Sequence, residues 1–218
     1  MSEDTSALPA RPLRDLIPAE AWQHIEDLPT RPHRAADTLL RQGEGGHHVL
    51  ALVDGLVKVV HTSRDGRKRL LAFRGPGELL GEMALQDGGV RTASVHAITD
   101  CKVKVLLAVD FRSFVEKYRL APQLAIYAVS RVREQTQGYD GDTVQRLAAA
   151  LLRLVEIAPK GRFSLTRDEL AQHLGVGRRS IAEALTVFGP ECVTVGRAWV
   201  EVLDPCRLRA LAGGEPYT

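Results

Sequence analysis

The sequence contains little cysteine, few aromatic residues and no long hydrophobic run. The three cysteines, Cys101, Cys192 and Cys206, stand far apart, so they predict neither a disulfide framework nor a CxxC metal site, and we expect them to be small buried side chains. Aromatic residues make up 5% of the chain. No stretch approaches the roughly 18 apolar residues of a membrane-spanning helix, and the first residues lack the apolar segment of a secretion signal. We therefore expect a cytoplasmic protein with no membrane partner.

An excess of charge of one sign is also missing. The 29 Lys and Arg residues nearly balance the 27 Asp and Glu residues, which leaves a formal net charge of +2. Any nucleic-acid binding must therefore come from a local arrangement of charges. The motifs GxxxxGK[ST], GxSxG and HExxH are absent as well, so the sequence does not predict an enzyme. The length of 218 residues predicts one or two globular domains.

Short strands are expected from about Arg34 to Val109. Valine and leucine residues flank the pair Asp54-Gly55, and the same arrangement recurs around Asp65-Gly66. An Asp-Gly pair between two apolar runs is a strong signal for a β-hairpin. The segment therefore predicts two hairpins within a small barrel or sandwich.

The pattern becomes helical after Asp110, which is expected to be a helix N-cap. Pro122 fits the first turn of a long helix that should end near Gly138. The glycine-rich segment 138–142 predicts a domain boundary, and Asp142 is expected to cap the next helix. One apolar stripe on that helix is formed by Val144, Leu147, Leu151, Leu154 and Val155.

The C-terminal part of the chain predicts two short helices joined by a tight turn. Thr166 and Glu169 form a capping box, and the helix that they open should end at Gly175. A second helix follows, with Ile181 and Leu185 facing inward. This layout is typical of a DNA-binding helix-turn-helix.

A hairpin is expected directly after these two helices. Apolar and polar residues alternate over 193–202 around Gly196, as they do in a β-hairpin wing.

A more specific motif lies upstream, over 77–95. This segment resembles the phosphate-binding cassette of cyclic-nucleotide-binding domains. The resemblance implies that Gly81 lets the backbone approach a phosphate, that Arg91 pairs with it from a solvated pocket, and that Glu82 accepts from a ribose hydroxyl. The implied ligand-binding residues are Gly81, Glu82, Met83, Ala84, Arg91, Thr92, Ala93 and, from the long helix, Arg131.

The strand-rich segment, the cassette, the long helix and the helix-turn-helix together resemble the cyclic-AMP receptor/fumarate-nitrate regulator (Crp/Fnr) family of bacterial transcription factors. The segments 165–175 and 203–208 match this family's first DNA-binding helix and the ending that follows its wing. The resemblance implies an α+β fold with a jelly-roll-like β-roll, a long dimerisation helix and a C-terminal winged helix-turn-helix. The expected parts are an N-terminal extension (1–30), a cyclic-nucleotide-binding-like β domain (31–109), a connecting helix (110–138) and a DNA-binding domain (139–218).

The resemblance also implies partners. It predicts a homodimer paired through Ile126, Val129 and Val132, a palindromic double-stranded DNA site, and RNA polymerase as a further partner. No cofactor is required, and cyclic AMP or cyclic GMP is the expected effector. The implied DNA-binding residues are Thr166, Arg178, Arg179, Ser180, Glu183 and Arg197.

Departures from the family pattern leave alternatives open. No cysteine cluster precedes Cys101, which argues against an iron-sulfur sensor. The positions expected to offer hydroxyl groups to adenine read Arg131-Val132-Arg133, which brings cyclic GMP close to cyclic AMP as a candidate. A regulator of the same fold whose pocket is vestigial or takes a different ligand is the main alternative. A nucleotide-binding regulatory subunit of an enzyme is a further one, against which the helix-turn-helix argues.

Overall fold

The computed structural model describes residues 11–86, 88–136, 141–158 and 162–213. The first part of the chain contains a 3-10 helix (Leu13–Asp15), α1 (Ala19–Glu26), β1 (Thr30–His33), β2 (Thr38–Leu40), β3 (His48–Asp54), β4 (Val57–Thr62), β5 (Lys68–Arg74), β6 (Glu78–Leu80), α2 (Glu82–Gln86), β7 (Ser94–Ala97) and β8 (Cys101–Leu107). The second part contains α3 (Ala108–Lys117), α4 (Ala121–Thr136), α5 (Thr143–Ile157), β9 (Arg162–Phe163), α6 (Arg167–Leu174), α7 (Arg178–Phe188), β10 (Val193–Val195), β11 (Val200–Val202) and α8 (Pro205–Leu211).

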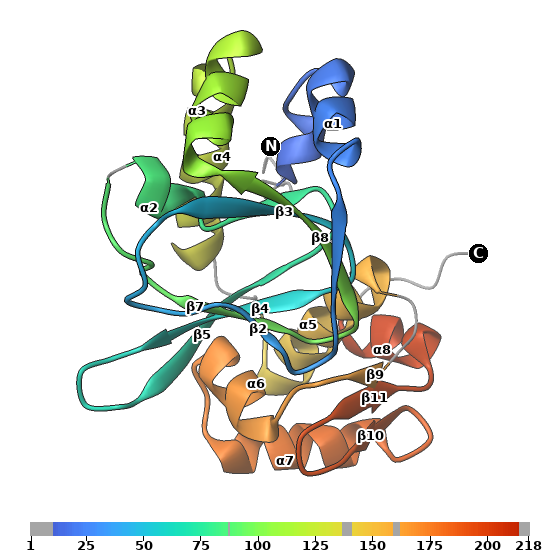
Figure 1. The fold of residues 1–218 in the computed structure, drawn as a ribbon. Coiled ribbons are helices and arrows are strands. Elements are labelled where there is room, and N and C mark those ends of the chain that lie inside the picture. Colours follow the sequence, from blue (N-terminus) through green and yellow to red (C-terminus); the bar gives the residue numbers. More distant parts are fainter. Residues whose placement is uncertain (1–10, 87, 137–140, 159–161, 214–218) are drawn as a thin grey trace, which may run out of the picture.

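Two four-stranded antiparallel sheets form the β domain (Figure 1). Their strand orders are β1-β8-β3-β6 and β2-β7-β4-β5. Alternate residues of both sheets meet in a shared apolar core that includes Leu50, Leu52, Val57, Val95 and Val103. The predicted β-roll is confirmed.

One of the two predicted hairpins is wrong. β3 and β4 flank Asp54-Gly55 but lie in different sheets, so this turn is a crossover between sheets. Gly55 has a φ of +92°, and a Cβ atom there would collide with the carbonyl oxygen of Asp100. The close packing of the turn against this loop directs the chain out of the first sheet. The hairpin around Asp65-Gly66 is confirmed, because β4 and β5 pair antiparallel.

The outer side of the first sheet is covered by helices from both ends of the β domain. Leu13, Trp22 and Ile25 from the N-terminal segment share a core with Phe111 and Phe114 of α3. The sequence offers no prediction for this N-terminal segment. The predicted N-cap at Asp110 is wrong, since α3 begins at Ala108 with Leu107 as its N-cap. Asp110 lies in the first turn, where its charge still complements the helix dipole.

The C-terminal part agrees closely with the sequence patterns. Asp142 and Thr166 both form capping boxes, and Gly175 ends α6 in the left-handed region with a φ of +65°. β10 and β11 form the predicted wing, and β9 adds an unpredicted third strand. The predicted helix end at Gly138 and most of the break at 138–142 lie outside the described residues.

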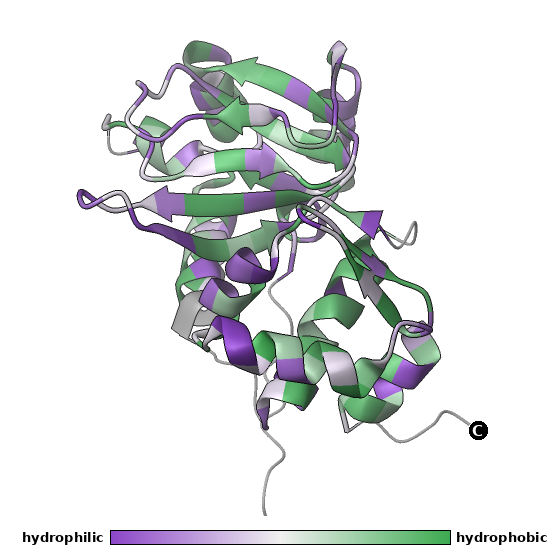
Figure 2. Cartoon of the chain, turned by 90° about the horizontal axis from the view of Figure 1, so that it is seen from below, coloured by the Kyte–Doolittle hydropathy of each residue, from purple (hydrophilic) through white to green (hydrophobic). Residues whose placement is uncertain are grey.

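The first helix of the helix-turn-helix, α6, packs directly against the β domain (Figures 1 and 2). Phe73 of β5 contacts His173 of α6, with ring centroids 4.7 Å apart, and the Ser164 amide donates to the Ile98 carbonyl at 3.0 Å. One apolar cluster contains residues from both sides of this contact, among them Leu56, Leu70, Phe73, Leu170 and Leu174.

The three cysteines differ in burial. Cys101 and Cys192 are buried as expected, whereas Cys206 is exposed on α8. None of the helices in the described residues has the length and apolar character needed to cross a bilayer.

Candidate functional site

The cassette is built around Gly81 and Arg91. Gly81 follows β6 with a φ of +85°, and a Cβ atom there would collide with Nη1 of Arg91, so both backbone and space require glycine. The Arg91 guanidinium donates hydrogen bonds to the carbonyl oxygens of Gly81 and His48. Arg91 therefore joins the start of β3 to the cassette.

The expected exposure of Arg91 is wrong. The residue is only 3% exposed, and its guanidinium is hydrogen-bonded to two backbone carbonyls. Burial lowers the pKa of Arg91, and the negative charges of Glu82 and Glu44 act against this shift. The side chain thus has a structural role within the cassette.

The other cassette residues differ in exposure. Ala84 is buried and Ala93 is half-buried, whereas Met83 and Thr92 are exposed. Burial raises the pKa of Glu82, and a backbone hydrogen bond and the charge of Arg74 oppose that shift. The pKa of Glu82 therefore lies above its usual value.

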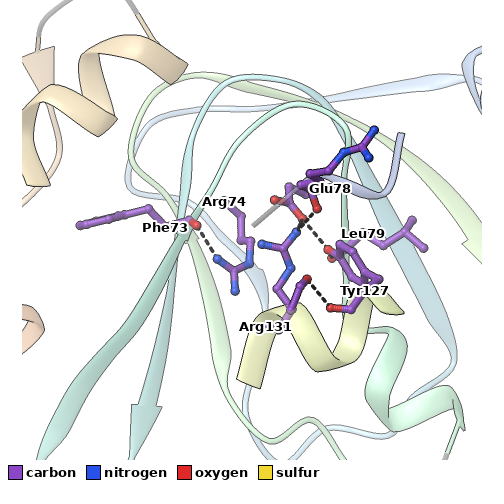
Figure 3. Close-up of polar contacts among 8 residues, drawn as sticks. Phe73, Arg74, Glu78, Leu79, Tyr127 and Arg131 are labelled. Atoms are coloured by element: carbon purple, nitrogen blue, oxygen red, sulfur yellow. Dashed lines mark hydrogen bonds and ion pairs between the residues drawn. The ribbon is translucent and has the colours of Figure 1, made fainter. Parts of the chain in front are cut away.

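A buried polar network joins the cassette strand to the long helix (Figure 3). Glu78 on β6 accepts from the Tyr127 hydroxyl at 2.5 Å and lies 2.7 Å from Nη2 of Arg131. The Arg131 guanidinium also lies 4.3 Å from the centre of the Tyr127 ring. Burial and the neighbouring charge of Glu78 raise the pKa of Tyr127 well above its usual value. We call Glu78, Tyr127 and Arg131 the Glu78 network.

The hydrogen bonds of Arg131 within the chain bear on its expected role in ligand binding. Besides Glu78, the guanidinium donates to the carbonyl oxygen of Arg11 at 2.9 Å, and the residue is 8% exposed. Contact with the base of a ligand would require Arg131 to share or leave these acceptors.

The long helix α4 has two different faces. Leu124, Tyr127 and Arg131 are buried against the β domain. The predicted dimer seam occupies the opposite face, where Ile126, Val129 and Val132 are 58%, 52% and 63% exposed. This chain therefore presents an apolar strip to solvent.

Two arginines open the second helix of the helix-turn-helix. The side chains of Arg178 and Arg179 at the start of α7 are 77% and 92% exposed. Arg178 Nε lies 2.5 Å from Oδ1 of Asp168, and Arg179 Nε lies 2.9 Å from Oε1 of Glu183. Ser180 is half-buried in the same turn.

A hollow lies between the first helix and the wing. It has a volume of about 540 Å³ and is lined by Thr166, Arg167, Asp168, Val195, Gly196 and Arg197. The fold thus brings together Thr166 and Arg197, two residues that the resemblance implicates from distant parts of the sequence. The Thr166 hydroxyl accepts from the Glu169 amide at 3.1 Å as part of the capping box.

Sequence reasoning missed Glu78, Tyr127 and the domain-spanning residue Lys58. Lys58 on β4 forms an ion pair with Glu169 on α6. A signal existed for Glu78, because a charged residue directly before Leu79 and Leu80 in a buried strand needs a buried partner. Nothing local to Tyr127 or Lys58 indicates which distant residue each contacts.

Comparisons with known proteins agree with this arrangement. Residues 30–118 match the cyclic nucleotide-binding domain, and residues 145–211 match the Crp-like helix-turn-helix domain. The chain is 30% identical over 205 residues to the cyclic AMP receptor protein of Thermus thermophilus, covering 91% of this chain and 95% of that protein. It is 27% identical over 177 residues to the CRP-like cAMP-activated global transcriptional regulator of Mycobacterium tuberculosis, covering 76% of each.

A solved structure of a related protein agrees with these sequence matches. The crystal structure of the Thermus thermophilus catabolite activator protein is 30% identical, with a TM-score of 0.51 and coverage of 93% of this chain and 99% of that one. Both matched domains agree with relatives that are named as a cyclic AMP receptor protein and a cAMP-activated transcriptional regulator. The chain belongs to the Crp/Fnr family of bacterial transcription factors.

Proposed function

We propose that this chain is a homodimeric transcriptional regulator that binds a palindromic DNA site and is controlled by a cyclic mononucleotide bound at the cassette (77–95). The observation that carries the proposal is the Glu78 network, which connects the cassette strand to α4 in the protein interior. Through this network, a change in the cassette on ligand binding would reach the helix that bears the proposed dimer seam. A cytoplasmic location and RNA polymerase as a further partner are part of the same proposal.

The proposed ligand contacts follow from the resemblance of this segment to phosphate-binding cassettes. Arg91 provides the charged partner for a singly charged cyclic phosphate, and the backbone after Gly81 provides N–H donors. Glu82 accepts from a ribose hydroxyl, while Met83, Ala84, Thr92 and Ala93 line the site. Cyclic AMP is the leading candidate, with cyclic GMP close behind because the Arg131 guanidinium can donate to a guanine carbonyl. No cofactor is needed.

The proposed DNA contacts lie at the start of α7, at the start of α6 and on the wing. Arg179 reads base edges, and Arg178 contacts phosphate together with Thr166 and Arg197. Ser180 and Glu183 occupy the same reading helix. Because Arg178 and Arg179 each hold an acidic partner within the chain, DNA must exchange these intramolecular ion pairs for its own.

One observation favours a second candidate, a regulator of the same fold with a vestigial pocket. Arg91 is buried and its guanidinium already donates to two backbone carbonyls, so its hydrogen bonding within the cassette is supplied by the chain itself.

Calorimetric titration of the purified protein with cyclic AMP and cyclic GMP separates the two candidates. Under the sensor proposal one of these nucleotides binds and raises the affinity for a palindromic duplex. If neither binds at millimolar concentration while the palindrome is still bound, the vestigial-pocket regulator takes its place.

The DNA side is tested by selection of genomic fragments followed by substitution. We expect inverted repeats with half-sites about 34 Å apart, one helical turn. The Arg179→Ala variant should lose about 1 to 3 kcal/mol on the selected site and little on unrelated DNA. Equal losses on all sequences would assign Arg179 to the phosphate backbone.

A further inference from the structure

The hairpin between β4 and β5 ends in a concentrated positive charge. Four basic residues, Arg64, Arg67, Lys68 and Arg69, surround the single acidic residue Asp65, and all five are exposed. The whole chain has a formal net charge of only +2, so the concentration is local. We call these four basic residues the basic tip.

Most of this charge is available to a partner. Asp65 is occupied within the turn, since it accepts from Arg67 Nε at 2.6 Å and from the Ser63 hydroxyl at 2.7 Å. Within the described ranges, Arg64, Lys68 and Arg69 have no carboxylate within 4 Å. Three cations therefore face solvent without a counter-charge from the described part of the chain.

The hairpin backbone is held in one geometry. The Gln42 side chain donates to the Thr62 carbonyl at 2.8 Å and accepts from the Thr62 amide at 2.7 Å. Beyond this clamp, the Ser63 amide donates to the Arg67 carbonyl at 2.9 Å. Cations carried on a fixed backbone lose less conformational entropy on binding than those on a flexible tail of the same charge.

The hairpin lies beside the first helix of the helix-turn-helix. β5 packs against α6 through Leu70 and Phe73, and the tip extends outward at the level of α6 (Figure 1). Seen from below, the tip again projects beyond the body of the molecule as a hydrophilic end (Figure 2). It therefore belongs to the end of the molecule that carries Arg178 and Arg179.

We propose that the basic tip is an accessory DNA contact that binds backbone phosphates flanking the sequence read by α7. This inference rests on the proposed function, because it extends the DNA site outward from the palindrome. Phosphate contacts of this kind are independent of base sequence and release condensed counterions, so they make binding steeper in salt.

The experiment compares a triple variant, Arg64→Gln, Lys68→Gln and Arg69→Gln, with the wild-type protein on two duplexes. One duplex contains the palindrome alone, and the other extends it by about one helical turn on each side. The matched control carries Arg31→Gln, Arg112→Gln and Lys117→Gln, three exposed cations of β1 and α3.

We expect the triple variant to bind the long duplex more weakly than the wild type does and to match the wild type on the short one. Its plot of log affinity against log salt on the long duplex should be shallower by about 0.9 for each phosphate that the variant no longer neutralises. The control variant should retain the wild-type slope.

Equal slopes for the triple variant and the wild type on the long duplex would overturn the inference and leave the proposed function intact. Unchanged DNA binding with reduced transcription in a reconstituted RNA polymerase assay would also overturn it and assign the tip to a protein partner. Failure of the wild-type protein to bind any palindromic duplex would instead remove the proposed function itself, and the inference with it.

Discussion

Lys58 Nζ lies 2.6 Å from Oε1 of Glu169, and this ion pair joins the β domain to the first helix of the helix-turn-helix. The two side chains are only 12% and 21% exposed. Lys58 also donates to the Ser164 carbonyl at 3.1 Å, while the other Glu169 oxygen accepts from the Thr166 amide at 2.9 Å. The same carboxylate thus caps a helix and fixes that helix to a neighbouring domain.

The Lys58→Met variant should be less stable than the wild type. It removes the Lys58 ammonium from Oε1 of Glu169 and from the Ser164 carbonyl in a largely buried place, which we expect to reduce the free energy of unfolding by about 1–3 kcal/mol. Urea unfolding measures the loss. The control is Lys102→Met, whose partner Asp54 lies 3.2 Å away in an exposed pair, and which should cost less than about 1 kcal/mol. Equal losses in the two variants would contradict the importance of the Lys58 pair.

The stabilisation from this pair should depend on pH. Burial alone would raise the pKa of Glu169, but the hydrogen bond and charge of Lys58, together with the hydrogen bonds of Thr166, outweigh it and lower the pKa below 4.5. A lowered folded-state pKa means that the contribution is complete above pH 4.5 and is lost as pH falls through the folded value. The difference in unfolding free energy between wild type and Lys58→Met should therefore narrow between pH 5 and pH 3, roughly the interval in which carboxylates titrate. A constant difference across that interval would exclude the mechanism.

Gly81→Ala and Gly66→Ala form a matched pair of variants. Both glycines have positive φ, +85° and +79°, so both substitutions strain the backbone by about 1 kcal/mol. At Gly66 nothing lies within 4 Å of the new methyl group, whereas at Gly81 it would displace Arg91. The melting temperature should therefore fall further for Gly81→Ala, at about 2–4 °C per kcal/mol for a chain of this size. Similar melting temperatures would show that Arg91 moves aside at little cost.

Arg91→Ala should destabilise the protein even when no nucleotide is added. The substitution removes the Arg91 donors from two partly buried backbone carbonyls, those of Gly81 and His48, and should cost about 1–3 kcal/mol. Thermal unfolding in the absence of nucleotide measures this loss. Titration of the folded variant below its melting temperature then reports the ligand contact separately. An unchanged melting temperature would contradict the structural role of Arg91.

Val129→Glu should weaken a dimer formed through α4. The substitution would place like charges opposite each other in a desolvated seam, so sedimentation should show a shift toward monomer at micromolar concentration. Val109→Glu is the control, since Val109 is 65% exposed on α3, outside the proposed seam. A wild-type protein that sediments as a monomer at this concentration would remove the basis of the prediction.

Local signals allow much of the fold to be predicted, and long-range contacts account for most of what is missed. The caps at Asp142 and Thr166 are predictable because a capping box involves residues only three positions apart. The Asp54-Gly55 turn has the same local signal as Asp65-Gly66, but its packing against Asp100 decides that it crosses between sheets. The local sequence of a turn does not indicate which distant residues will pack against it.

The candidate site shows the same division. The resemblance points to Gly81 and Arg91, which the fold brings into contact. It does not indicate that Arg91 donates a hydrogen bond to the carbonyl oxygen of His48, a residue 43 positions away in the chain. The pairing of Glu78 with Arg131 spans 53 positions and depends on how α4 packs across the β domain. Such distances exceed the range over which spacing in a single sequence carries information.

The two faces of α4 have a thermodynamic consequence. Because Val129 and Arg131 stand on one rigid helix, a rotation of that helix about its axis moves both at once, toward one set of contacts and away from the other. If the chain pairs across this helix as proposed, a ligand that alters the pairing of Glu78 would change the free energy of that association, and association would change the affinity for the ligand by the same factor. The apparent affinity for the nucleotide would then depend on the protein concentration, because that concentration sets the fraction of dimer.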